Sequence, residues 1–268
     1  MSGEKPEPPV PVASATIMLL RDGQAGLEVF MVKRHHQIDF ASGALVFPGG
    51  KLAPGDRDPA LRDYCDGAAG LDDGELALRA GAIREAFEES GILLARPSGS
   101  PGGSSGFLSA EALEGVQRFR PALDKGELGL VPFLRDHGLR LAVDALVRFA
   151  HWVTPTFMPK RFDTHFYVAV APQGQLGAHD GRESVDSTWI TPGDATADPK
   201  RWTVIFPTRM NLEKLGRAGS AEDALARARA DRIVSVLPWI DASSGKPMLR
   251  IPADAGYGDV AEPLENLR

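Results

Sequence analysis

Residues 84–92 read REAFEESGI and place three glutamates within five residues. On a helix, Glu85, Glu88 and Glu89 occupy positions i, i+3 and i+4, so their carboxylates share one face. Like charges at this spacing repel each other by about 0.2–0.5 kcal/mol per pair on an exposed helix. The stretch is therefore either a solvated helix face that tolerates the repulsion or a site that binds a cation.

The sequence around these acids predicts a helix over about residues 75–90. Asp72 or Asp73 can cap its N-terminus, and Gly91 can end it in the left-handed conformation. An apolar stripe on one side is predicted from the spacing of Leu76, Ala80, Ile83 and Phe87. The glutamates fall on roughly the opposite side, which an ordinary amphipathic helix would also show.

A glycine-rich turn precedes this helix in the sequence FPGGKLAPGD, residues 47–56. Gly49 and Gly50 permit a tight backbone path directly after the predicted strand GALVF. Asp56 follows Gly50 by six positions, and Arg84 directly precedes the acids. These features together resemble the signature of the Nudix hydrolases. That signature runs from Gly through five residues to Glu, then through seven residues to Arg-Glu-aliphatic-any-Glu-Glu-any-Gly-aliphatic.

The second half of the signature matches at each specified position, namely Arg84, Glu85, Ala86, Glu88, Glu89, Gly91 and Ile92. The first half matches from Gly50, with Asp56 in place of the usual glutamate. Between the halves, 27 residues (57–83) replace seven, an insertion of 20. The entropy of loop closure rises only logarithmically with length, so the two halves can still meet. The resemblance implies that Asp56 pairs with Arg84.

The resemblance implies an α/β fold, a Nudix α/β/α sandwich with a mixed β-sheet, an extra helical insertion and a C-terminal extension. Strands and helices intermingle along the chain, which favours one elaborated domain. We expect a flexible leader at 1–12, a single hydrolase domain at 13–255 and a tail at 256–268. Within the domain, residues 57–75 form an insertion in the signature, and 96–140 form a loop and helical insertion. The segment from about residue 56 to 74 is predicted to have irregular structure.

By resemblance, the acidic helix holds Mg²⁺ or Mn²⁺, hard cations that prefer oxygen ligands. Glu88 and Glu89 would be the principal metal ligands. Glu85 would be a further ligand or the base that deprotonates the attacking water, with Arg84 in the same catalytic group. Glu183, six residues before a tryptophan, is a further candidate ligand or base, and the alternative is an exposed loop acid.

Substrate-binding candidates lie outside the helix. The guanidinium of Arg161 can bind a phosphate, and the alternative is an ion pair with Asp163 or another acid. The full set of predicted substrate-binding residues is Gly49, Gly50, Arg34 and Arg161. Asp56 and Gly91 are assigned structural roles within the signature.

The implied activity is metal-dependent cleavage of the diphosphate linkage of a nucleoside diphosphate derivative. The inserted signature, with GALVFPGGK and REAFEESGILLAR, resembles the branch that contains the mammalian peroxisomal coenzyme A diphosphatase and its bacterial relatives. Coenzyme A or acyl-CoA is therefore the leading substrate. Two alternatives stay open: an NADH or ADP-ribose pyrophosphatase, and a non-catalytic Nudix-fold module that senses a nucleotide.

The net charge and the distribution of apolar residues limit the classes of partner that we expect. The net charge of −6 argues against a nucleic-acid backbone as the partner and leaves a small molecule. No apolar run approaches the roughly 18 residues of a membrane span, and the proline-rich start lacks the apolar core of a secretion signal. We therefore expect no membrane partner and a cytoplasmic location. A homodimer, common in the superfamily, is left open. The single cysteine, Cys65, is not required by this chemistry.

Overall fold

The computed structural model of the chain describes residues 7–34, 43–100, 106–175, 177, 184–243 and 245–264. For Arg34, Ser184 and Val185 it describes the backbone alone.

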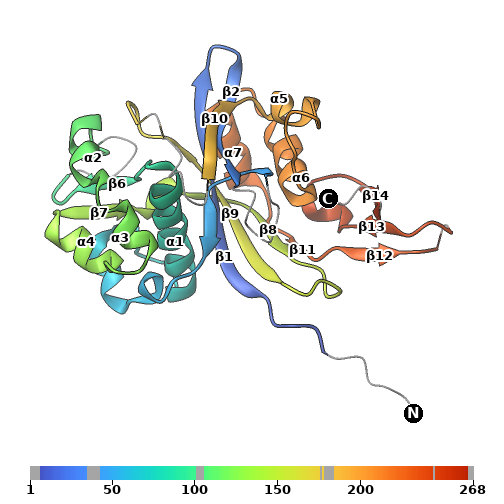
Figure 1. Ribbon diagram of the computed structural model, residues 1–268, viewed down its shortest axis with the longest axis horizontal. Coiled ribbons are helices and arrows are strands. Elements are labelled where there is room, and N and C mark those ends of the chain that lie inside the picture. The colour runs from blue at the N-terminus through green and yellow to red at the C-terminus, as the bar shows by residue number, and fades with distance from the viewer. Residues whose placement is uncertain are drawn as a thin grey trace.

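A mixed β-sheet forms the centre of the molecule (Figure 1). Its strands lie in the order β10 (Ser184–Ile190), β2 (Gly26–Arg34), β1 (Val12–Gly23), β9 (Phe162–Val170), β8 (Val147–Val153) and β11 (Ser235–Val236). β1 pairs in parallel with β9 and β11 in parallel with β8, while the other neighbours along this path are antiparallel. Two short strands, β3 (Leu45–Val46) and β4 (Gly49–Lys51), pair with β2 and β1.

Both faces of this sheet are buried, as its sequence dictates. In β1, Ile17 and Leu19 pack into one apolar cluster, whereas Met18 and Leu20 pack into a second. Successive side chains of a strand point to opposite faces, so a continuous apolar run supplies a core on each side. The sheet is therefore the middle layer of an α/β/α arrangement.

One face of the sheet is covered by α1 (Asp73–Ser90) together with α2 (Ala110–Gln117), α3 (Arg120–Asp124) and α4 (Leu130–Asp136), on the left of Figure 1. A small three-stranded sheet, β5 (Cys65–Asp66), β7 (Leu139–Ala142) and β6 (Ala95–Pro97), lies on the same side. These helices confirm the predicted helical insertion before β7.

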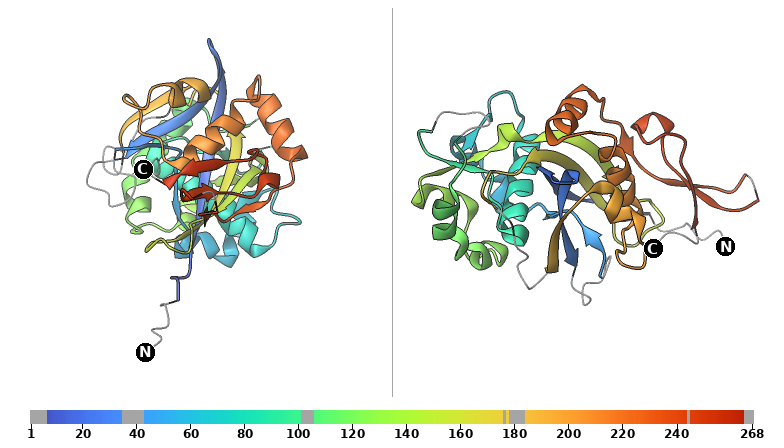
Figure 2. Two further views of the ribbon diagram at one scale, coloured as in Figure 1. Left: turned by 90° about the vertical axis from the view of Figure 1, so that its right-hand side faces the viewer. Right: turned by 90° about the horizontal axis from the view of Figure 1, so that it is seen from above.

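The opposite face is covered by α5 (Pro192–Ala197), α6 (Phe206–Leu215) and α7 (Ala221–Ala230). A second small sheet, β12 (Trp239–Asp241), β13 (Met248–Arg250) and β14 (Ala261–Pro263), extends from this side (Figure 2). Among the helices that the structure describes, none combines the length and apolar character needed to cross a bilayer.

The inserted part of the signature is more ordered than its composition predicts. Two 3₁₀ helices, Pro54–Arg57 and Pro59–Tyr64, lead directly into β5. Leu61 and Cys65 are buried in the same apolar cluster as α1. The prediction of irregular structure over residues 56–74 was therefore wrong in part. Short 3₁₀ turns and a two-residue strand are too short to give a hydrophobic periodicity in the sequence. Two further 3₁₀ turns are Val143–Ala145 and Ala253–Ala255.

Candidate active site

Helix α1 begins and ends as the sequence predicts. The side chain of Asp72, rather than Asp73, caps it by accepting a hydrogen bond from the amide of Glu75 at 2.7 Å. Gly91 ends it with φ of 72°, a left-handed conformation that suits glycine. Glu88 and Glu89 are only 6% exposed, so the interpretation of a solvated helix face is wrong.

Arg84 is the centre of the acidic group. Its Nε and Nη2 donate to the two carboxylate oxygens of Asp56, each at 2.9 Å, which is the pairing that the resemblance implied. Its Nη1 donates to Oε2 of Glu88 at 2.6 Å, and Nη2 also donates to Oε1 of Glu85 at 2.9 Å. A further bond from Nη2 reaches the carbonyl of Lys51 at 3.0 Å. One guanidinium therefore orients three carboxylates and the glycine strand.

Strand β4 passes directly over the acids. The amide of Gly49 donates to Oε2 of Glu89 at 3.0 Å. A Cβ atom on Gly50 would lie only 2.5 Å from Oε1 of Glu85, and one on Gly49 would lie 2.6 Å from the carbonyl oxygen of Ala15. Gly49 therefore has no room for a side chain against the neighbouring strand, whereas a side chain at Gly50 would displace the carboxylate of Glu85.

The pKa values of Glu88 and Arg84 are both shifted from their ordinary values. Burial raises the pKa of Glu88 to about 8; the charge of Arg84 lowers it, and that of Glu85 raises it. Burial alone would lower the pKa of Arg84, but its hydrogen bonds to Asp56 and the charges of the nearby carboxylates raise it above its ordinary value. Oε1 of Glu88 is buried and has no hydrogen-bond partner among the described residues. A buried carboxylate oxygen without a hydrogen-bond partner suits a hard divalent cation.

The acids line a cavity of about 1040 Å³. Its polar end comprises Gly49, Gly50, Lys51, Arg84, Glu85, Glu88 and Glu89. Its walls are largely apolar and include Phe47, Trp152, Phe157, Met158, Phe162 and Phe206. The cavity can therefore accept a molecule that has an anionic group at one end and an apolar or aromatic part elsewhere.

The remaining predicted residues lie apart from this group or outside the described residues. Arg161 donates to the carbonyls of Thr154 at 3.0 Å and Pro9 at 2.8 Å, so it holds the segment before β1. Its role in phosphate binding stays a prediction. Arg34 ends β2, but its side chain is not described, and Glu183 lies outside the described residues. Their roles also stay predictions.

The structure brings other charged residues to the cavity. Asp124, the last residue of α3, lines it, and its charge contributes to the raised pKa of Glu88. Lys160 lines it from the segment before β9. Neither residue belongs to the signature, and no spacing in the sequence distinguishes them from surface charges. The sequence alone therefore could not have revealed them.

The helical insertion also holds the C-terminal end of α1. Arg120 donates through Nη2 to the carbonyl of Glu88 at 3.0 Å, and Gln117 donates to the carbonyl of Gly91 at 2.9 Å. These bonds satisfy carbonyls that the end of a helix leaves without helical partners. The insertion thus fixes the backbone that carries the acids.

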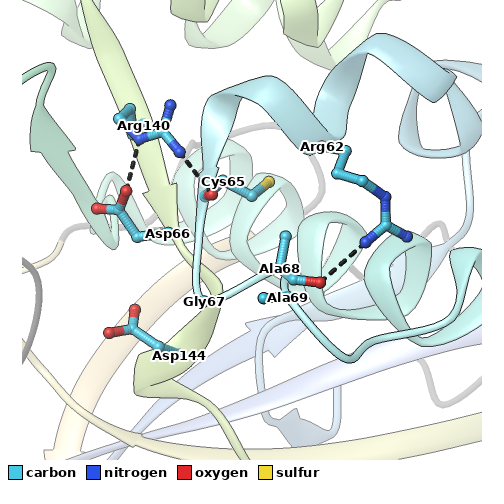
Figure 3. A pocket seen from close by; sticks show the side chains of 8 residues that line it. All are labelled: Arg62, Cys65, Asp66, Gly67, Ala68, Ala69, Arg140 and Asp144. Carbon is cyan, nitrogen blue, oxygen red and sulfur yellow. Dashed lines mark hydrogen bonds and ion pairs between the residues drawn. The ribbon is translucent and has the colours of Figure 1, made fainter.

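A second pocket, of about 520 Å³, lies at the inserted segment (Figure 3). Arg140 donates to Asp66 and to the carbonyl of Cys65, and Arg62 donates to the carbonyl of Ala68. Burial raises the pKa of the Cys65 thiol to about 12. The two pockets share no lining residue, so Cys65 has no place in the chemistry of the acidic cavity.

Comparison with known protein sequences identifies the family of the chain. The family model described as NUDT19 Nudix domain matches residues 66–209, more than half of the chain. A human protein named acyl-coenzyme A diphosphatase NUDT19 is 26% identical over 90% of this chain and 75% of its own length. The protein of the same name from Xenopus laevis is 25% identical over 67% of this chain, and the match spans only 57% of that relative.

A solved structure gives the same result for the fold. The crystal structure of a Nudix hydrolase from Alicyclobacillus acidocaldarius superposes with a TM-score of 0.66 at 28% identity. The similarity covers 81% of this chain and 96% of that protein. The family match, the inserted signature and the Arg84-centred acids agree, and the chain belongs to the Nudix hydrolase family.

Proposed function

We propose that the chain hydrolyses the diphosphate linkage of coenzyme A or its thioesters, with Mg²⁺ or Mn²⁺ held by Glu85, Glu88 and Glu89. The observation that carries this proposal is Oε1 of Glu88, which is buried at the edge of the cavity without a hydrogen-bond partner among the described residues. A buried carboxylate oxygen without a partner is costly unless a cation binds it. Burial of this carboxyl group also raises its pKa.

The residues of the chain would position the reacting groups. Arg84 fixes the carboxylates of Glu85 and Glu88, while the amide of Gly49 fixes that of Glu89. When bound, the divalent cation would neutralise the diphosphate and lower the pKa of a water molecule. We assign Glu85, which lies directly beneath Gly50, as the group that would accept a proton from the attacking water.

The reaction requires no covalent intermediate. The oxygen of water forms a bond to one phosphorus, and the bond from that phosphorus to the bridging oxygen breaks. One proton of the water passes to the base, and the bridging oxygen leaves on the other phosphate. Coenzyme A would yield an adenosine bisphosphate and phosphopantetheine.

The choice of coenzyme A among diphosphates rests on two observations. Relatives that match the chain are named acyl-coenzyme A diphosphatase. The cavity has an acidic end and apolar walls, which suits a substrate with a diphosphate and a long, partly apolar arm. NADH and ADP-ribose carry the same diphosphate but have a second ribose and, in NADH, a nicotinamide ring instead of that arm.

A substrate panel tests the proposal. The purified chain is incubated with Mg²⁺ or Mn²⁺ and coenzyme A, an acyl-CoA, NADH, ADP-ribose or a dinucleoside polyphosphate, and the products are identified by mass. We expect the highest kcat/KM for coenzyme A or its thioester, and almost none for Glu88→Gln. Preference for NADH or ADP-ribose would contradict the substrate assignment. Tight binding of a nucleotide without turnover would support a sensing module and contradict catalysis.

A further inference from the structure

A second group of metal-ligating side chains lies outside the acidic cavity. His151 of β8 and His165 of β9 are directly opposite each other, and their rings stack with centroids 4.1 Å apart and planes inclined by 18°. Asp163 lies two residues before His165 on the same strand, so it shares that face. One ligand atom from each of these three residues lies within 4.8 Å of the others.

This group faces away from the hydrolase cavity. In β9, Phe162, Thr164 and Phe166 line the cavity. Asp163 and His165 alternate with them along the strand and therefore point to the other face of the sheet. The group is distinct from the glutamates of α1.

The hydrogen bonds around His151 orient its ring. Its Nδ1 lies 2.7 Å from Oγ of Ser235, which is paired with His151 in the parallel strand β11 (Figure 1). Its Nε2 lies against the carboxylate of Asp163, and Nε2 of His165 lies 3.6 Å from the same oxygen. In metal-bound histidines one ring nitrogen commonly meets a polar neighbour while the other meets the metal, and Ser235 supplies such a neighbour for Nδ1 of His151.

We propose that His151, Asp163 and His165 form a binding site for Zn²⁺ or a similar transition-metal ion. Two imidazoles and one carboxylate are a common set of three zinc ligands, with water in the fourth position. Imidazole ligands favour Zn²⁺, Cu²⁺ or Ni²⁺ over Mg²⁺, which prefers oxygen. The bound ion joins β8 to β9 and, through Ser235, to β11.

The side chain of Arg148 lies next to this site and opposes metal binding. Its Nη2 is 3.3 Å from Nδ1 of His165, and its Nε is 3.7 Å from a carboxylate oxygen of Glu75. The side chain is 45% exposed, so it can move to solvent when a cation enters. Removing its positive charge should tighten metal binding.

The test uses the full chain after removal of bound metal with a chelator. Mg²⁺ is added in excess to occupy oxygen-only sites, and Co²⁺ is titrated as a spectroscopic probe for Zn²⁺. We expect one equivalent of Co²⁺ with visible absorption typical of tetrahedral nitrogen–oxygen coordination, and its displacement by Zn²⁺. Zn²⁺ should also raise the melting temperature.

Variants assign the ligands. Asp163→Asn and His165→Asn should abolish the Co²⁺ absorption, Ser235→Ala should weaken binding by about ten- to hundredfold, and Arg148→Gln should tighten it. Glu88→Gln, which alters the hydrolase site, should retain the absorption and so separates this proposal from the proposed function. Circular dichroism checks that each variant folds.

Three results would overturn the proposal. They are wild-type protein that shows no Co²⁺ absorption, an absorption that persists in Asp163→Asn, and an Arg148→Gln variant that binds no more tightly. The last measurement decides the question even when a ligand variant fails to fold, because Arg148 is half exposed and contributes little to the core.

Discussion

Arg84 and Asp56 form a two-bond ion pair, with both nitrogen–oxygen distances at 2.9 Å, across 28 positions of sequence. The side chain of Asp56 is fully buried and that of Arg84 is 9% exposed. The pair joins the two halves of the signature in spite of the insertion. It also fixes the guanidinium that orients Glu85 and Glu88.

Removal of the charge on Asp56 should destabilise the protein strongly. Asp56→Asn leaves the guanidinium of Arg84 buried with a weaker partner, and the loss of one member of a buried pair costs about 3–5 kcal/mol. Urea unfolding at neutral pH measures this difference. The matched control is Asp73→Asn, because Asp73 is 98% exposed in its pair with Arg62 and should contribute at most about 1 kcal/mol. Equal losses in the two variants would contradict the role of the buried pair.

The two glycines of β4 should respond differently to alanine. In Gly50→Ala the new Cβ would meet the flexible carboxylate of Glu85, so stability should be nearly kept while kcat falls at least about tenfold. In Gly49→Ala the Cβ would meet backbone atoms of Ala15 and Thr16, so stability itself should fall by about 1–3 kcal/mol. Thermal unfolding and a hydrolysis assay separate the two effects. Full activity of Gly50→Ala would show that catalysis does not depend on the position of the Glu85 carboxylate.

Cys65 should be unreactive in the folded protein. Its pKa is raised from 9.0 to about 12 by burial, so the thiol stays protonated at neutral pH and the thiolate fraction falls about a thousandfold. A raised pKa lowers the reactivity of the thiol, because the protonated and unreactive form predominates at every pH below the pKa. Iodoacetamide labelling followed by mass spectrometry should detect modification only after unfolding in urea. Rapid stoichiometric labelling of the folded chain would contradict this.

Asp72 should matter more to α1 than its neighbour. Asp72→Ala removes the side chain that accepts from the amide of Glu75 and should cost about 1 kcal/mol of unfolding free energy. Asp73→Ala should cost less, because that side chain is 98% exposed in its ion pair with Arg62. Urea unfolding of both variants measures the contrast. A larger loss of unfolding free energy for Asp73→Ala would contradict the assignment of Asp72 as the N-cap.

Much of the fold could be predicted from the sequence because local patterns determine it. The apolar runs of β1 and β2, the cap at Asp72 and the glycine at position 91 all act on their immediate neighbours. The signature additionally predicted a long-range pair, Asp56 with Arg84, because both residues occupy defined positions in it.

Other features depend on tertiary packing and have no local signal. The burial of Glu88 and Glu89 arises from β4 and from the helices that follow, so an amphipathic pattern alone suggested a solvated face. Asp124 reaches the cavity only because α3 packs on α1. The backbone partners of Arg161 lie seven and 152 positions away, and its sequence neighbours suggested an acid instead.

The Mg²⁺-dependent hydrolysis of coenzyme A by wild type, Glu88→Gln and Glu114→Gln tests most directly whether the acidic helix forms a catalytic metal site. Both substitutions remove one carboxylate charge, but Glu114 is exposed on α2. Glu88→Gln should lower kcat at least about a hundredfold, because it removes a proposed metal ligand, while Glu114→Gln should match wild type. Wild-type rates in Glu88→Gln, with the same dependence on Mg²⁺, would show that Glu88 does not hold a catalytic metal ion.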